Sequence, residues 1–173
     1  EVFLENGKLD DAWKLAKFAV DHAKEKKIWR QRLAQISEWH GKPIEALQQW
    51  RILAQETGDE AAWQAVLRLA PGLFDDEALL PALRYQLQQK PGDKVLIRQI
   101  VEAKIRLAEP RQAIEFLAEQ YRRQLDSDYL AWQASIAEDA GLLDQAVAYW
   151  QQLFADPEQP TPQRKKQKTV IIR

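Results

Sequence analysis

The sequence predicts an all-α solenoid built from antiparallel helix pairs. Three observations support this fold class: a short motif that returns about every 34 residues, glycines that fall in the turns of that register, and apolar residues at helical spacing between the turns. Repeats of this length are typical of arrays in which each helix pair buries its apolar face against its neighbours. With 173 residues, 46% of them hydrophobic, the chain is long enough to bury a core.

The repeat motif is a small residue followed, five positions later, by an alanine. It occurs at Gly7–Ala12, Gly41–Ala46, Ala108–Ala113 and Gly141–Ala146. The first two copies lie 34 residues apart, and the interval from the second to the third corresponds to two repeats, of 34 and 33 residues. Trp29 and Trp63 keep the same 34-residue interval. Because all six glycines also fall in turns of this register, the pattern predicts one repeated structural unit.

Each unit is predicted to contain two helices joined by a tight turn. In the second unit, apolar residues recur at helical spacing up to Gly41, which can end a helix in the left-handed conformation. Pro43 suits the first turn of the partner helix, and Asp59 can cap the helix that follows. The same reasoning predicts helices at 9–24, 28–40, 43–56, 60–70, 76–89, 94–107, 110–124, 128–140 and 143–155.

The third unit departs from this frame. A Pro-Gly-Leu segment at 71–73 replaces the turn motif, and Leu80 and Pro81 stand where the alanine is expected. These residues predict a longer loop between the two helices, or a late helix start, near 71–81.

The expected array covers residues 1–156, and residues 157–173 are expected to be a Pro-rich, basic linker or a truncated element. The array divides into a partial repeat, 1–26, and full repeats at 27–60, 61–93, 94–126 and 127–156. The chain starts at Glu1 and contains no Met, so we expect it to be a piece of a longer polypeptide. Cut repeat ends would expose helix faces at 1–24 and 143–155, which predicts self-association.

Composition and motifs argue against several classes of function. Two His, three Ser and no Cys leave few members for a catalytic constellation, and the glycines are too far apart for a phosphate-binding loop. We therefore predict a non-enzyme with no cofactor and no metal. A net charge of −1 argues against nucleic-acid binding. No apolar run approaches the ~20 residues that cross a bilayer. Acid pairs such as Asp75-Asp76 are assigned to helix capping.

The Trp/Leu, small residue and alanine pattern of this 34-residue helix–turn–helix unit resembles the tetratricopeptide repeat. The resemblance covers about residues 1–156 and implies a right-handed superhelix whose concave groove is lined by the first helix of each unit. Ten residues on those helices are candidate partner contacts: Arg32, Gln35, Glu38, Trp39, Arg98, Glu102, Arg106, Trp132, Glu138 and Asp139. The alternative for each residue is a solvated face with charge pairs such as Glu102–Arg106.

The tryptophans divide into two groups. Trp29 and Trp63 occupy equivalent repeat positions, as do Trp50 and Trp150, and this regularity favours a role in the core between helices. Trp39 and Trp132 break the regularity, which makes them the candidate aromatic contacts. In the third unit the inward positions predict an apolar middle of the groove, made of Ala62, Ala65, Val66 and Leu69.

One tetratricopeptide subclass can be excluded from the residues present. Its members bind chaperone tails by holding a terminal carboxylate with paired Lys and Asn side chains on successive first helices. This chain has a single Asn, Asn6, which is not on a complete first helix. The carboxylate clamp therefore cannot be assembled.

A second resemblance runs through residues 39–59, Trp-His-Gly-Lys-Pro-Ile-Glu-Ala-Leu-Gln-Gln-Trp-Arg-Ile-Leu-Ala-Gln-Glu-Thr-Gly-Asp. This stretch is similar to the periplasmic repeat region of the PelB family, the outer-membrane export proteins for the Pel exopolysaccharide of biofilms. The resemblance implies a periplasmic scaffold that precedes a C-terminal porin and recruits a polysaccharide-modifying partner, a PelA-like deacetylase and hydrolase.

Two other functions stay open. One is a generic bacterial assembly adaptor that binds a peptide in the concave groove. The other is direct binding of a cationic, partly deacetylated polysaccharide by Glu38, Glu102, Glu138 and Asp139. Polymer binding through scattered acids should weaken steeply with salt, whereas an apolar protein interface should not.

Overall fold

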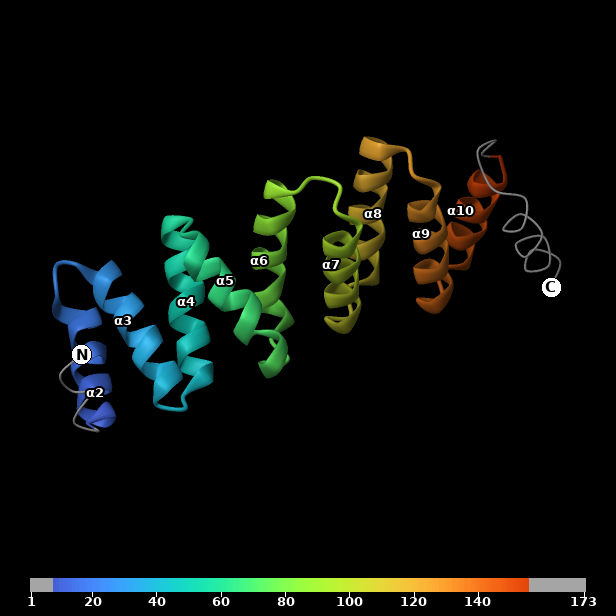
Figure 1. The fold of residues 1–173 in the computed structure, drawn as a ribbon. Helices are drawn as coiled ribbons and strands as arrows, with labels where there is room; N and C mark the ends of the chain where they lie inside the picture. Colours follow the sequence, from blue (N-terminus) through green and yellow to red (C-terminus); the bar gives the residue numbers. More distant parts are fainter. Residues whose placement is uncertain (1–7, 156–173) are drawn as a thin grey trace. The chain divides into compact units, whose positions relative to one another are not determined.

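The computed structural model describes residues 8–155 (Figure 1), and its chain between these limits is helical apart from short turns. The helices are α2 Leu9–His22, α3 Lys26–Trp39, α4 Pro43–Thr57, α5 Glu60–Leu69, α6 Asp76–Gln89, α7 Lys94–Arg106, α8 Pro110–Gln124, α9 Ser127–Asp139 and α10 Leu143–Ala155, with a short 3-10 helix, η1, at Pro71–Leu73. The predicted linker, 157–173, lies outside the described residues.

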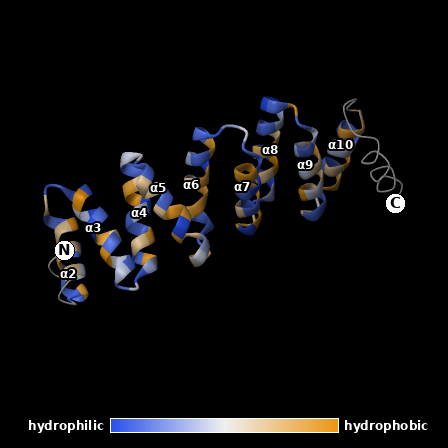
Figure 2. Cartoon of the chain, viewed as in Figure 1, coloured by the Kyte–Doolittle hydropathy of each residue, from blue (hydrophilic) through white to orange (hydrophobic). Residues whose placement is uncertain are grey.

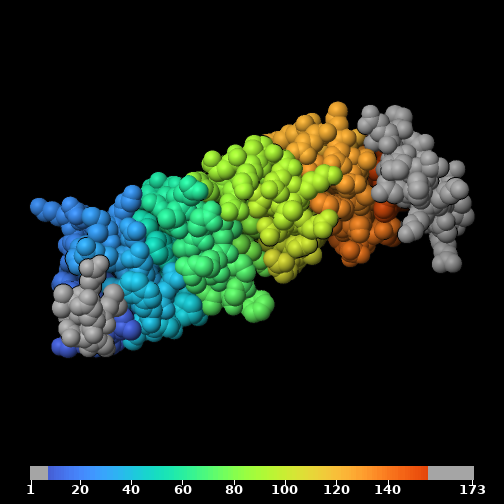
Figure 3. All heavy atoms as spheres, viewed as in Figure 1, coloured from blue at the N-terminus to red at the C-terminus, as the bar shows by residue number. Residues whose placement is uncertain are grey.

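The predicted all-α fold of antiparallel helix pairs is confirmed, and each predicted helix is present with its ends within about two residues. Figure 2 shows why these segments pair: each helix carries apolar residues along one side and polar residues along the other. The helices divide into two compact units, with the division between Tyr85 and Gln86, inside α6. Within each unit, the colours of Figure 3 follow the sequence, because each helix packs on its neighbours in the chain.

Two kinds of turn alternate along the chain. Between repeats, an aspartate caps the next helix: Asp59 accepts a hydrogen bond from the Ala62 N–H at 3.0 Å, and Asp93 and Asp126 do the same for α7 and α9. Within repeats, a residue with positive φ precedes the second helix, as Gly41 does at φ 71°. The predicted roles of Gly41 and Asp59 are confirmed.

The third repeat has the predicted longer loop. Six residues, 70–75, separate α5 from α6, whereas three separate α3 from α4. The late helix start is wrong, because α6 begins at Asp76, directly after Asp75 caps it through the Ala78 N–H at 2.8 Å. Pro81 lies inside α6, and its missing N–H removes one helical hydrogen bond.

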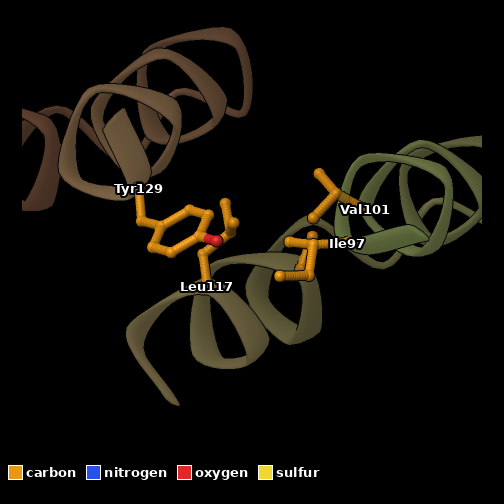
Figure 4. Packing of buried hydrophobic residues seen from close by; sticks show 5 residues of the cluster. Ile97, Val101, Leu117 and Tyr129 are labelled. Atoms are coloured by element: carbon orange, nitrogen blue, oxygen red, sulfur yellow. The ribbon is translucent and has the colours of Figure 1, made fainter. Parts of the chain in front are cut away.

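The core consists of small clusters between neighbouring helices. In the second unit, Ile97 and Val101 of α7 meet Leu117 of α8 and Tyr129 of α9 (Figure 4). In the first unit, Leu33 packs with α2, and partly buried Trp29 covers the cluster.

Most of the regular tryptophans belong to the core, as predicted: Trp50 and Trp63 are 6% and 7% exposed, and Trp29 is partly buried. Trp150 is only half-buried. The predicted apolar middle of the groove is wrong for Ala62 and Val66, because both are fully buried against neighbouring helices. These side chains therefore stabilise the repeat and offer no surface to a partner.

Candidate binding groove

A cavity of about 500 Å³ lies between α7 and α9, the first helices of two successive repeats. It is lined by Arg98, Val101, Glu102, Ile105, Arg106, Trp132, Ser135 and Ile136. Arg98, Glu102, Arg106 and Trp132 are four of the ten predicted contact residues, so the structure brings them together at one surface. The cavity has the size and the mixture of apolar surface and few polar groups that are typical of binding sites in proteins.

Arg98 and Trp132 form the centre of this groove. The Arg98 guanidinium carbon lies 5.1 Å from the centre of the Trp132 ring, which is cation–π geometry. The indole in turn packs edge-on against the buried Tyr129 ring, with the centroids 5.7 Å apart. No carboxylate pairs with Arg98 within the described residues. The tryptophan is therefore held from below, and the arginine presents its N–H donors to a ligand.

An ion cluster fixes the spacing of α7 and α9 at their N-terminal ends. The Lys94 ammonium lies 2.5 Å from Asp126 and 2.9 Å from Asp128. Hydrogen bonds to Asp126 and then Asp128 raise the pKa of Lys94. Burial of Asp126 favours its neutral form, but the Lys94 ammonium outweighs this effect and lowers the pKa of that carboxyl. The cluster is charged at neutral pH and helps hold the groove walls.

Two predicted contacts on α9 lie outside the cavity. Glu138 accepts a hydrogen bond from the Trp150 indole N–H at 3.1 Å, and this contact joins α9 to α10. Asp139, the last residue of α9, is exposed. Glu138 therefore has a structural partner within its own repeat.

The equivalent face of the first unit, between α3 and α5, is bridged by side chains. Glu38 accepts a hydrogen bond from the Trp50 indole at 2.7 Å and forms an ion pair with Arg68 of α5, also at 2.7 Å. Burial opposes ionisation of Glu38, but the hydrogen bonds from Arg68 and Trp50 prevail, so its pKa is lowered. This predicted contact residue is thus engaged within the fold.

The other predicted contacts on α3 differ in exposure. Arg32 lies over the Trp29 ring, 4.9 Å from its centre, so its guanidinium already has an aromatic partner. Gln35 is half-buried. Trp39 is 59% exposed, which leaves most of its ring accessible. The structure does not join these residues into a cavity comparable with that of α7 and α9.

The two faces use the same repeat positions. The left-handed turn residue after α3 and the one after α7 lie 67 residues apart, as do the capping aspartates before α5 and α9. The same interval leads from Glu38 to Ile105 and from Arg68 to Ser135. An ion pair in the first unit thus corresponds to two lining residues of the groove in the second.

Sequence reasoning missed three lining residues, Val101, Ile105 and Ile136. Their apolar side chains follow the helical period of α7 and α9, so they resemble ordinary core residues. Only the missing cover at this point of the array distinguishes them, and no local signal in the sequence reports that.

Among the described residues, no cluster of three or more His, Asp or Glu side chains is arranged to hold a metal ion. In the same part of the chain, no helix is both long enough and apolar enough to cross a membrane.

The fold has counterparts among solved structures. The structure of Naa15/Naa10 bound to HypK-THB contains a chain that matches 87% of this one with a TM-score of 0.65 at 14% identity. This chain spans only 24% of the length of that one. The solved structures also include TTC0263, a thermophilic TPR protein from Thermus thermophilus, with TM-score 0.47, 16% identity and coverage of 99% and 94% of the two chains. MamA matches with TM-score 0.44 and 15% identity over 97% and 95%.

Capping aspartates at 59, 93 and 126 place successive helix pairs 34 and 33 residues apart, which is the tetratricopeptide period. The fold is of the tetratricopeptide type. No protein-family model and no curated protein matches the sequence. At 14% identity, the solved structure establishes the fold of this tetratricopeptide array and not its partner.

Proposed function

We propose that this chain is a non-catalytic protein-interaction scaffold that binds a segment of a partner protein in the groove between α7 and α9. The observation that supports this proposal is the Arg98–Trp132 pair above an apolar floor. Trp and Arg are the residue types that contribute most to binding energy at interfaces. The polar side chains around the floor supply orientation, and none of them forms a nucleophile–base pair that would suggest chemistry.

The finer proposal is that the scaffold serves Pel-type exopolysaccharide export in the periplasm, where it recruits a PelA-like deacetylase and hydrolase beside an outer-membrane porin. The resemblance of residues 39–59 to the PelB family supports it. Such a scaffold would act by presentation, because holding the enzyme near the pore raises its effective concentration at the emerging polymer. A generic adaptor that binds a peptide in the same groove is the alternative.

Direct binding of a cationic polysaccharide is less well supported. Of the four acids proposed for that role, Glu38 already pairs with Arg68, and Glu138 accepts a hydrogen bond from Trp150. Only Glu102 lines the groove, and Arg98 and Arg106 line it too. A groove with two arginines and one glutamate would repel a cationic polymer.

The test is binding of the purified Pel-type deacetylase, measured by calorimetry at two salt concentrations. Trp132→Ala should weaken binding at least tenfold, since it removes the aromatic anchor and the surface on which Arg98 rests. Trp39→Ala, which removes the exposed aromatic side chain of α3, is the matched control and should leave affinity within about twofold. Equal losses in both variants would contradict the assignment to this groove.

Two further outcomes separate the alternatives. If the deacetylase does not bind but an unrelated peptide does, and Trp132→Ala abolishes that binding, the generic adaptor is correct. If only partly deacetylated glycan binds, and its affinity falls steeply with salt, the scaffold proposal is wrong and polymer binding replaces it.

A further inference from the structure

The turn inside each full repeat uses the same backbone geometry. The residue just before the second helix has a positive φ in all four described cases: Gly41, Phe74, Ala108 and Gly141. The next residue donates its backbone N–H to a carbonyl five residues earlier in each turn, as Asp75 does to Ala70 at 3.1 Å. Two of the four residues are glycine, which takes this conformation without the steric cost of a Cβ atom.

Phe74 is an unusual residue for this position. Its φ is 54°, a left-handed conformation that is unfavourable for a bulky side chain. The ring gains nothing from the fold in return, because Phe74 is 92% exposed. A strained backbone that presents an exposed aromatic ring indicates a contact with another molecule. The exposure also shows that the ring is not seated in a groove of its own chain.

The surroundings of Phe74 define the chemistry of its partner. Asp75, Asp76 and Glu77 follow it directly, and the next basic residue is Arg84. A pocket for this loop should therefore combine an apolar floor with a basic rim. An anionic membrane surface would be repelled by the same carboxylates.

The α7–α9 groove has these properties. Its floor includes Ile105 and Ile136, Trp132 offers an aromatic wall, and Arg98 stands at the wall without a carboxylate partner among the described residues. Its volume of about 500 Å³ is large enough for a phenylalanine side chain and adjoining backbone. Glu102 is the one lining group that opposes an acidic loop.

We propose that the Phe74 loop of one copy inserts into the α7–α9 groove of a second copy. The contact joins two different surfaces, so it is heterologous and can extend beyond a dimer. One loop in one groove buries less surface than a standard interface, so the dissociation constant should be of the order of 100 μM or weaker. This inference does not depend on the proposed export partner.

Sedimentation velocity from about 20 to 500 μM tests the contact. Wild type should associate as its concentration rises, and Phe74→Gly should stay monomeric with a more stable fold, because glycine relieves the left-handed strain. Arg98→Glu and Trp132→Ala should stay monomeric as well. Agreement between the two groove variants guards against a loss caused by misfolding, since Arg98 is exposed.

Mixing the variants gives the decisive result. Phe74→Gly keeps its groove and Arg98→Glu keeps its Phe74, so an equimolar mixture should form dimers and nothing larger. Association of Phe74→Gly equal to that of wild type would overturn the proposal and assign self-association to other exposed apolar residues, such as Phe18 of α2 and Val147 of α10. A wild-type chain that stays monomeric to 500 μM would overturn it too.

Leu125→Gly is the matched control. Leu125 has φ 53° and is 70% exposed, so this substitution also removes an exposed apolar side chain from a left-handed turn. The acids beside it, Asp126 and Asp128, already pair with Lys94. Leu125→Gly should therefore raise stability as Phe74→Gly does, but leave association unchanged. Equal loss of association in both glycine variants would mean that general surface hydrophobicity causes it, and would overturn the specific contact.

Discussion

The face between α3 and α5 and the face between α7 and α9 have the same place in their repeats but different surfaces. In the first unit, Glu38 and Arg68 form an ion pair across the face. In the second, the equivalent positions are Ile105 and Ser135, and both line a cavity. Two side-chain positions thus separate a bridged face from an open groove, although the helices that carry them are alike. In such arrays, binding sites arise where side chains stop bridging neighbouring repeats.

The largest expected effect comes from transferring the ion pair. Ile105→Glu with Ser135→Arg should bridge α7 and α9 and fill the groove with two long side chains. We expect partner binding to fall about 100-fold, or roughly 2.7 kcal/mol, because the apolar floor and the space above it are both lost. Calorimetry with the purified deacetylase measures this loss, and circular dichroism confirms that the variant is folded.

The reverse exchange is the control for that experiment. Glu38→Ile with Arg68→Ser removes the bridge in the first unit and leaves the α7–α9 groove intact, so affinity should stay within about twofold. If the transferred ion pair leaves binding unchanged, the groove is not the binding site and the comparison between the two faces has no functional meaning.

A second prediction concerns two glycines in equivalent turns. Gly58 and Gly92 both have positive φ, but a Cβ at Gly58 would meet no atom within 4 Å, whereas one at Gly92 would overlap the Gln124 amide. Gln124 also accepts a hydrogen bond from the Tyr129 hydroxyl at 3.0 Å. Gly58→Ala should destabilise the fold by about 1 kcal/mol through backbone strain alone.

Gly92→Ala should cost about 2 kcal/mol, because Gln124 must also move away from Tyr129. Urea unfolding followed by circular dichroism measures both free energies of unfolding. Equal costs would show that Gln124 moves freely and that this turn does not support the groove.

The helices could be predicted from the sequence because their ends are set by local signals. Gly41, Pro43 and Asp59 each act within a few residues of their own position, and the structure assigns them the predicted roles. The third turn could not be predicted in the same way. Gly72 suggested the turn residue, yet the left-handed residue is Phe74, because a 3-10 turn at Pro71–Leu73 replaces the end of the first helix.

The candidate site was only partly visible in the sequence. The frame placed Arg98, Glu102, Arg106 and Trp132 on inward faces, and the structure gathers them in one groove. It could not show that Glu38 lies within 2.7 Å of both the Trp50 indole and Arg68, since those contacts join separate helices. Whether an inward acid is available to a ligand depends on such long-range partners, which a repeat pattern does not report.

The smallest expected effect is the pH dependence that Glu38 contributes to the first unit. Its pKa in the folded chain lies below the ordinary value of 4.5, because the hydrogen bonds from Arg68 and Trp50 outweigh burial. A carboxyl of this kind stabilises the fold at pH values above about 4.5 and loses that contribution as the pH falls through its folded-state pKa. The contribution should be about 1 kcal/mol or less, because the ion pair is partly solvated.

Urea unfolding at pH 7 and pH 3 measures this dependence. Glu38→Gln should reduce the difference in stability between the two pH values, and Arg68→Gln should reduce it similarly, since each removes one member of the same ion pair. The double variant should change it little further, because the pair acts as one interaction. If Glu38→Gln keeps the full pH dependence of the wild type, the ion pair contributes nothing to the first unit, and the face between α3 and α5 is closed by packing alone.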